Sequence, residues 1–327
     1  IDQYLRKVNY LRVSVTDRCD LRCVYCMKEK MQFLPRKDIL TLEEIERICD
    51  NFIDLGVEKI RLTGGEPLVR SDILKLIEKL NNKKNFTNLK EITLTTNGTL
   101  LKKYAKELKL NGVDRINVSL DTINSEKYNI ITRFGNIEKV FDGINEALDA
   151  DIKIKINTVV IKDFNENEIE DLIEWTDKKK IDLTFIEVMP MEETDISREY
   201  QFVSLSETFE KLNQKYNFLI SNHNTGGPAR YYTSNLLSTK IGFISPLTNN
   251  FCATCNRVRI SSTGKLFMCL GQNDYVDFRE IMRKDFSDDY IKEKIRFALN
   301  IKPKNHDFMI GTKINKYMKR HMNVTGG

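Results

Sequence analysis

The first two-thirds of the chain alternate between short runs rich in β-branched residues and longer stretches whose apolar positions repeat at helical spacing. Such runs predict strands, and the stretches between them predict amphipathic helices. We expect strands at Arg12–Val15, Lys59–Thr63, Glu91–Thr95, Ile116–Leu120, Lys153–Val160 and Leu183–Val188. We expect helices near residues 42–55, 72–80, 100–110, 136–149 and 166–178. Thr41 and Glu44 form a capping-box pattern that marks the start of the first helix.

Strands that alternate with helices over short connections predict a parallel sheet with helices outside it. Six strand–helix units are fewer than the eight of a closed barrel, so the expected fold is α/β, an open partial (β/α)6 barrel of TIM type. Shorter apolar runs, at Lys240–Pro246, Val258–Ser261 and Lys265–Met268, replace this pattern nearer the C-terminus. We therefore expect a partial barrel over residues 1–200 and a smaller antiparallel and helical region over residues 201–327.

The composition is that of an ordinary globular protein, with 41% hydrophobic and 30% charged residues. No apolar run approaches the roughly 20 residues that a membrane-spanning helix needs, so no membrane association is expected. The first residues also lack the apolar core of a secretory signal. The chain does not begin with Met, and we expect that a few native residues precede Ile1.

The net charge of +5 comes from 52 basic and 47 acidic residues, which is a nearly balanced mixture. This balance does not favour a nucleic-acid partner, because nucleic-acid binding proteins carry a concentrated basic surface. A small basic excess is more useful in a local pocket that binds an anionic ligand.

Seven cysteines are present, and six of them fall into two tight groups. An odd number of cysteines without a secretory signal favours metal binding in a reducing compartment over a disulfide framework. We therefore expect a cytoplasmic protein with two metal-binding cysteine groups.

The first group, Cys19, Cys23 and Cys26, has the spacing C-x3-C-x2-C and directly follows the first predicted strand. Three thiolates can hold three irons of a [4Fe–4S] cluster and leave the fourth iron open to a small molecule. A structural zinc site is the alternative, but it usually needs a fourth ligand, and no other Cys or His is near in the sequence. Cys49 lies inside a helical pattern and is expected to be an ordinary buried thiol.

The second group, Cys252, Cys255 and Cys269, has the spacing C-x2-C-x13-C. This spacing alone leaves a zinc ribbon and an iron–sulfur cluster as equal alternatives. If the residues after Cys255 form a strand, Arg257 and Arg259 point to one face. Two guanidiniums beside a metal cluster suit a phosphate-bearing ligand. A solvated basic edge strand is the alternative, but the even spacing beside an open cluster favours the ligand.

Polar residues also stand where several predicted strands end. Thr63-Gly64-Gly65-Glu66-Pro67 follows the second strand, Thr95-Thr96-Asn97-Gly98 the third, and Ser119-Leu120-Asp121 the fourth. The C-terminal strand ends are where a β/α barrel builds its active site. Each segment alone is equally typical of a turn or a helix cap, and Met189 alone would be assigned to the core.

Two of these motifs resemble those of the radical S-adenosylmethionine enzymes: Cys19-Asp20-Leu21-Arg22-Cys23-Val24-Tyr25-Cys26, and Gly64-Gly65-Glu66-Pro67 after it. The similarity to one family within this group, the GTP 3′,8-cyclases of molybdenum cofactor biosynthesis, covers nearly the whole chain. It includes residues 11–19, 61–67 and 117–121 and the double-glycine end. The C-terminal cysteine group with Arg257 and Arg259 is its most discriminating part.

The resemblance implies a lyase that carries two [4Fe–4S] clusters, one binding S-adenosylmethionine and the other the guanine of GTP. A radical derived from S-adenosylmethionine abstracts the ribose 3′-hydrogen, and C3′ then bonds to C8 of the guanine. The product is (8S)-3′,8-cyclo-7,8-dihydroguanosine 5′-triphosphate, in the first step of cofactor biosynthesis.

The resemblance also assigns roles to single residues. The GTP-contacting positions are Arg12, Arg61, Thr95, Lys155, Arg257 and Arg259. The positions that contact S-adenosylmethionine are Tyr25, Gly65, Ser119 and Met189. The terminal residues Gly326 and Gly327 match a tail that reaches into the active site and takes part in catalysis. One position departs from the family pattern, because Thr184 stands where members usually carry Arg, and Thr supplies neither its charge nor its fork of donors.

Two other functions remain as alternatives. One is a different radical enzyme that modifies a peptide and uses the second cluster as an electron relay. The other is a zinc-stabilised binding protein without redox chemistry. For the leading interpretation we expect GTP as substrate, an electron donor and a product-processing enzyme of the same pathway as partners, and we allow for a homodimer.

Overall fold

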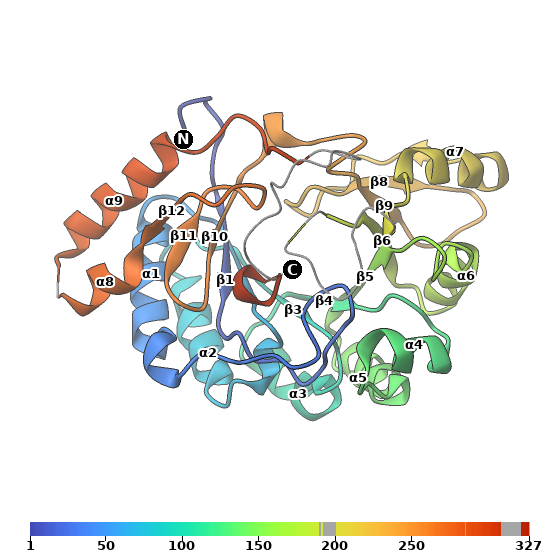
Figure 1. The fold of residues 1–327 in the computed structure, drawn as a ribbon, viewed down its shortest axis with the longest axis horizontal. Helices are drawn as coiled ribbons and strands as arrows, with labels where there is room; N and C mark the ends of the chain where they lie inside the picture. The colour runs from blue at the N-terminus through green and yellow to red at the C-terminus, as the bar shows by residue number, and fades with distance from the viewer. Residues whose placement is uncertain (190, 192–200, 285, 309–321, 327) are drawn as a thin grey trace.

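The computed structural model describes residues 1–189, 191, 201–284, 286–308 and 322–326 (Figure 1). Its centre is a row of six parallel strands in chain order, each hydrogen-bonded to the next. These strands are β1 (Tyr10–Ser14), β2 (Lys59–Thr63), β3 (Glu91–Thr96), β4 (Arg115–Ser119), β5 (Lys153–Val160) and β6 (Asp182–Glu187). All six predicted strands are confirmed to within two residues at each end.

Helices cover the outer face of this sheet (Figure 1). They are α1 (Leu42–Asp54), α2 (Ile73–Lys83), α3 (Leu101–Leu110), α4 (Ser125–Thr132), α5 (Ile137–Asp149) and α6 (Ile169–Lys178). The capping box at Thr41 is present, with Glu44 closing it. The helix α4 was not predicted, because its eight residues carry only a weak apolar stripe.

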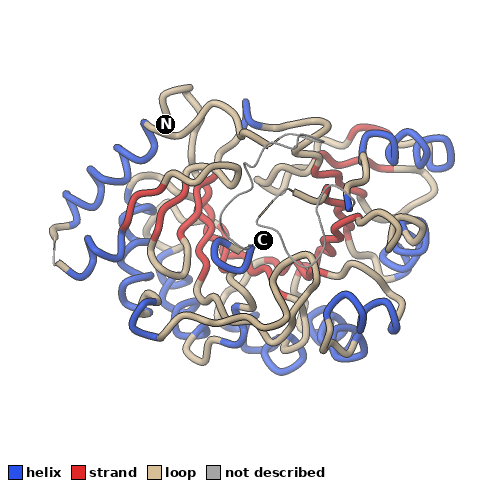
Figure 2. Tube along the Cα trace, viewed as in Figure 1, coloured by secondary structure: helices blue, strands red, loops and turns tan. Residues whose placement is uncertain are grey.

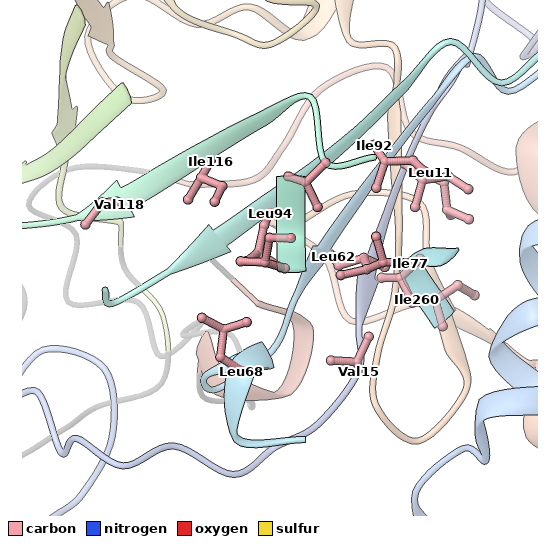
Figure 3. Packing of buried hydrophobic residues seen from close by; sticks show 14 of the residues in the cluster. Leu11, Val15, Leu62, Leu68, Ile77, Ile92, Leu94, Ile116, Val118 and Ile260 are labelled. Carbon is pink, nitrogen blue, oxygen red and sulfur yellow. The ribbon is translucent and has the colours of Figure 1, made fainter. Parts of the chain in front are cut away.

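The apolar face of the sheet packs against these helices. Leu11, Leu62, Leu94 and Ile116 are fully buried on successive strands, and Ile77 of α2 lies against them (Figure 3). Side chains alternate between the two faces of a strand, so the residues between these positions point to the opposite, inner face.

The C-terminal half extends the same sheet at both edges. On one side β10 (Arg257–Ile260) runs parallel to β1, and β11 (Lys265–Phe267) and β12 (Tyr275–Asp277) follow it antiparallel. On the other side β9 (Ile241–Ile244) runs parallel to β6, and β8 (Arg230–Thr233) and β7 (Leu219–Ile220) follow it antiparallel.

The strands together form one 12-stranded sheet, drawn as a curved row in Figure 2. Its two end strands, β12 and β7, are not paired with each other, so the predicted open α/β barrel with antiparallel additions is confirmed. Strands from both halves share this sheet, and the division of the chain at residue 200 stays a prediction.

The remaining elements lie around the additions. The helices are α7 (Leu205–Tyr216), α8 (Phe278–Arg283), α9 (Asp288–Asn300) and α10 (Met322–Thr325). Three-residue 3-10 turns occur at η1 (Arg36–Asp38), η2 (Pro67–Val69) and η4 (Cys252–Thr254). Across the part of the chain that the structure describes, no helix combines the length and apolar character needed to cross a membrane.

Candidate functional site

Strand alternation brings a set of basic side chains to the inner face of the sheet. Arg12 lies opposite Arg61 on β2 and opposite Arg259 on β10. These three residues line one cavity together with Lys155 and Arg257. The structure therefore places five of the six positions that the resemblance assigns to GTP around a single space.

The sixth position, Thr95, is buried at the end of β3, and its hydroxyl makes no hydrogen bond to any described residue. A buried polar atom without a partner is costly, and a bound ligand is one way to satisfy it.

Positive charge is concentrated in this cavity. Burial lowers the pKa of Arg12 well below its usual value, and the charge of Arg259 adds to the effect. Burial also lowers the pKa of Lys155 well below its usual value, with a further contribution from Arg61. Such shifts arise where cations crowd together away from water, and a polyanion bound among them would offset the repulsion between the cations.

Two further basic residues belong to the same face and were not singled out from the sequence. The Nζ atom of Lys59 lies 2.6 Å from a carboxylate oxygen of Glu91 and 2.7 Å from the carbonyl oxygen of Thr225. Arg115 also contacts Glu91, at 3.1 Å. Residues two apart on a strand point to the same face. Lys59 stands two residues before Arg61, and Arg115 two before Asn117, and both Arg61 and Asn117 line the cavity, so the strand period could have identified both basic residues.

The first cysteine group forms the loop after β1, where all three thiols are partly buried. Burial raises the pKa of Cys19, and the negative charges of Glu66 and Asp20 raise it further. Burial and the neighbouring Cys26 raise the pKa of Cys23. Three soft sulfur donors in one loop match the ligand set of an iron–sulfur cluster, which binds thiolates and so favours their deprotonation.

The glycine pair after β2 packs directly against this loop. The Gly65 amide donates to the carbonyl of Thr16 at 2.9 Å, and the Glu66 amide donates to the carbonyl of Arg18 at 2.8 Å. A Cβ atom at Gly65 would lie 2.3 Å from the Arg18 oxygen, so only glycine permits this approach.

The carboxylate of Glu66 is fully buried and accepts hydrogen bonds from the Leu68 and Asn97 amides and the Thr96 hydroxyl. Burial raises its pKa to about 7. The hydrogen bonds from Thr96 and Asn97 to Glu66 join the end of β3 to the glycine loop.

Tyr25, between the second and third cysteines, donates a hydrogen bond to Asp121 at 2.7 Å. Asp121 stands just beyond Ser119 at the end of β4, and burial raises its pKa to about 6. Met189 lines the same cavity as the basic residues. Three of the four positions assigned to S-adenosylmethionine therefore lie on the first cysteine loop or on segments next to it, and Met189 lies at the basic cavity. Asp121 joins the cysteine loop to the end of β4.

The second cysteine group lines the same cavity as the basic residues. Cys252 begins η4, Cys255 directly follows it, and Cys269 lies two residues after β11. Burial alone would raise the pKa of Cys255, but Arg257 and Lys302 lower it to about 7. The group therefore has a cationic setting, whereas the first group has acidic neighbours. Lys302 was missed in the sequence because a single Lys after a helix carries no motif.

The C-terminal tail returns to the inner face of the sheet. The helix α10 lies beside β1 (Figure 1). Asn323 donates to the carbonyl of Asp17 at 3.0 Å, and Arg259 donates to the carbonyl of Gly326 at 2.9 Å. Gly327 lies outside the described residues. One member of the proposed catalytic pair is thus placed beside a proposed GTP contact.

Thr184, the departure from the family pattern, is fully buried on β6. A Cβ atom on neighbouring Gly242 would lie 2.8 Å from its hydroxyl oxygen and 3.0 Å from the ring of Tyr231. The Tyr231 hydroxyl in turn accepts a hydrogen bond from Lys155 at 3.1 Å. The space beside Lys155 is therefore occupied by the tyrosine ring.

Comparison with known proteins identifies the family. Residues 13–176 match the Radical SAM superfamily, and residues 181–308 match the family described as Molybdenum Cofactor Synthesis C. Curated proteins named GTP 3′,8-cyclase from Brucella ovis and Brucella melitensis are each 51% identical to this chain, over 100% of it and 95% of their own lengths. The chain belongs to the GTP 3′,8-cyclases.

Solved structures show the same fold at lower identity. The SuiB protein of Streptococcus suis, in its complex with S-adenosylmethionine, is 19% identical to this chain, with a TM-score of 0.62 over 89% of this chain and 68% of SuiB. As a member of the radical S-adenosylmethionine superfamily, the chain uses an iron–sulfur cluster and S-adenosylmethionine. Family membership decides against the zinc-stabilised binding protein without redox chemistry.

Proposed function

We propose that this chain converts GTP into (8S)-3′,8-cyclo-7,8-dihydroguanosine 5′-triphosphate, the first step of molybdenum cofactor biosynthesis. The reaction removes the ribose 3′-hydrogen and joins C3′ to C8, which makes the enzyme a radical S-adenosylmethionine lyase. The observation that supports this most strongly is the basic cavity of Arg12, Arg61, Lys155, Arg257 and Arg259 that the second cysteine group also lines.

Cys19, Cys23 and Cys26 would hold the first cluster. With S-adenosylmethionine bound there, the pair supplies the 5′-deoxyadenosyl radical. Tyr25, Gly65, Ser119 and Met189 would position the S-adenosylmethionine. The close packing of Gly65 against the chain before Cys19 supports its place beside the first cluster.

Cys252, Cys255 and Cys269 would hold a second [4Fe–4S] cluster that orients the guanine. Thiolates suit both zinc and iron–sulfur clusters, so the donor set alone does not choose between them. The position of these cysteines supports a substrate-binding cluster, because they line the same cavity as the basic residues. A structural zinc ribbon would gain nothing from this placement.

The basic residues would bind the triphosphate. Arginine donates paired hydrogen bonds to phosphate oxygens, and charge-assisted bonds are about twice as strong as neutral ones. Thr95 offers a hydroxyl without a partner among the described residues. We assign Gly326 and Gly327 to positioning the substrate for radical transfer, with the Arg259–Gly326 hydrogen bond as support.

The remaining partners follow from the chemistry. Reductive cleavage of S-adenosylmethionine needs an electron donor, and the unstable cyclised nucleotide needs an enzyme that processes it further. The cytoplasmic location and the homodimer stay predictions, and so does the division into a barrel over residues 1–200 and a cluster-binding region over residues 201–327.

The test is anaerobic reconstitution with iron, sulfide, S-adenosylmethionine and GTP. We expect 5′-deoxyadenosine and the cyclised nucleotide in equal amounts, and roughly eight irons per chain. Formation of 5′-deoxyadenosine without a GTP-derived product would contradict the cyclase and favour another radical substrate. A content of roughly four irons with one zinc per chain would contradict the second cluster alone.

A further inference from the structure

Lys302 lies at the back of the second cysteine group. The helix α9 ends at Asn300, and Pro303 prevents its continuation. The chain turns inward between them, and the Lys302 side chain becomes one of the largest fully buried side chains, with 1% of its surface exposed. Complete burial of a lysine is rare unless its charge has a partner.

Three acceptors surround its Nζ atom. The carbonyl oxygen of Met268 lies at 2.5 Å, that of Arg257 at 2.9 Å, and the Sγ atom of Cys255 at 3.6 Å. An ammonium group has three N–H donors, which match these acceptors one for one. A neutral amine would have only two donors and would direct its lone pair at the third acceptor.

The charge partner is not a carboxylate. Among the described residues, no Asp or Glu lies within ion-pair distance of Lys302. Two other buried cations have one, since Arg6 pairs with Asp2 and Lys59 with Glu91. An uncompensated buried charge is strongly destabilising. Among the described residues, the polar partners of the Lys302 Nζ atom are therefore two carbonyl oxygens and the sulfur of Cys255.

The acceptors also show what Lys302 connects. Arg257 begins β10, two residues after Cys255, and Met268 directly precedes Cys269. The ammonium group thus joins the two chain segments that carry cysteines. Arg6 adds a second connection, because it donates hydrogen bonds to the carbonyl of Cys252 and to the carbonyl of Pro303, the residue after Lys302.

We propose that Lys302 is a positioning residue of the second cluster, which holds Cys255 and Cys269 at their separation and raises the reduction potential of that cluster. The proposal rests on the second cluster of the proposed function. A fixed positive charge beside a sulfur ligand stabilises the added electron, and charges and hydrogen bonds at the sulfurs are known to set such potentials.

The test measures the potential of the second cluster by itself. In the full chain with Cys19, Cys23 and Cys26 replaced by Ser, only the second group can hold a cluster. The reconstituted protein is titrated anaerobically with dithionite, and the reduced cluster is measured by electron paramagnetic resonance. Lys302→Met is compared with Lys302→Arg, which keeps the charge, and with Arg296→Met, which removes an exposed charge from the same helix α9.

At the potential where the parent is half reduced, we expect the ratio of reduced to oxidised cluster in Lys302→Met to fall about tenfold, which corresponds to 59 mV for one electron. Lys302→Arg and Arg296→Met should stay close to the parent. If Lys302→Met loses its iron, retention of iron by Lys302→Arg supports the charge, whereas equal loss from both overturns the proposal.

An unchanged ratio in Lys302→Met also overturns it. The proposed function fails in a different way, because then the parent itself holds no iron–sulfur cluster at the second group. The two failures are therefore distinguishable in one set of proteins.

Discussion

At the scale of single residues, the two cysteine groups differ in the charges around them. Glu66 and Asp20 lie beside the first group, whereas Arg257 and Lys302 lie beside the second. The first group therefore has a setting that disfavours further negative charge, and the second has one that favours it. This difference agrees with the proposed function, in which the first group would serve reduction of S-adenosylmethionine and the second would lie beside the anionic substrate.

The close packing of Gly326 against Thr63 gives a prediction at the scale of single residues. A Cβ atom there would lie 2.3 Å from Cγ2 and 2.6 Å from Oγ1 of Thr63, and its φ of +72° already favours glycine. Gly326→Ala must displace the tail, and displacements of about 1 Å can cost roughly 100-fold in rate. We expect a loss of that order in cyclised nucleotide per chain, measured by chromatography of anaerobic reactions.

Gly56→Ala is the matched control for this change. Gly56 also has a positive φ, of +95°, but nothing lies within 4 Å of the added atom. It should lower the free energy of unfolding by about 1 kcal/mol and leave turnover intact. Thr63→Ala combined with Gly326→Ala removes both clashing atoms and should restore part of the rate. Full turnover by Gly326→Ala alone would show that the close packing of Gly326 against Thr63 is not needed for the reaction.

At the scale of elements, the site is a product of strand alternation and register. Val258 points to the apolar face of β10 and is buried, whereas Arg257 and Arg259 on either side point to the cavity. Pairing of β10 with β1 then sets Arg259 opposite Arg12. Two strands separated by most of the chain thus build one binding surface.

Replacing either arginine of β10 by Gln should weaken GTP binding. Loss of a charge-assisted hydrogen bond costs roughly 1.5 to 3 kcal/mol, so we expect KM for GTP to rise about 10- to 100-fold. Arg230→Gln, at an exposed position at the start of β8, should leave KM unchanged. The measurement is initial rate against GTP concentration. Equal KM values for Arg257→Gln, Arg259→Gln and the parent would contradict the assignment.

An element could be predicted from the sequence when a pattern within its own residues determines it. The six central strands were predicted because each has its own apolar run, and Arg257 and Arg259 because their spacing matches the strand period. The short strands β7, β8 and β12 were missed, since they lie at or next to the edges of the sheet and have few buried residues. The pairing of β10 with β1 depends on contacts between distant segments, which no local pattern reveals.

The same limit explains the residues that were missed. Lys302 acquires its role only because α9 ends beside the cysteines. Asp121 was named as a strand-end residue, but its hydrogen bond with Tyr25 joins segments distant in the sequence and was not predicted. The resemblance to the family supplied the GTP positions, and the strand period could have added Lys59 and Arg115. By contrast, nothing in the sequence near Thr184 indicates that Tyr231 fills the neighbouring space.

At the scale of the whole molecule, the C-terminal half covers both edges of the six-stranded parallel sheet. The strands β10 and β9 cover the outer edges of β1 and β6, whose backbone groups would otherwise be exposed for pairing with other chains. The N-terminal segment is fastened to the same half. Arg6 donates to the carbonyls of Cys252, Pro303 and Lys304 and pairs with Asp2 at 2.6 Å.

Arg6→Met tests whether this fastening stabilises the entire protein. The side chains of Arg6 and Asp2 are 6% and 0% exposed, so the substitution leaves a buried carboxylate without its cation. Removing one partner of a buried pair costs roughly 3 to 5 kcal/mol. We expect a decrease of that size in the free energy of unfolding, measured by urea denaturation of the metal-free chain.

Lys7→Met is the natural comparison, because Lys7 is the adjacent basic residue, pairs with Glu58 and has a side chain that is 66% exposed. Exposed pairs contribute at most about 1 kcal/mol, so this variant should remain close to the parent. If Arg6→Met lowered the free energy of unfolding only as much as Lys7→Met, the contacts of Arg6 would not contribute to the stability of the protein. A larger loss, together with weaker iron retention at Cys252, would show that one guanidinium joins the start of the chain, its second cysteine group and the segment after α9 into a single cooperative unit.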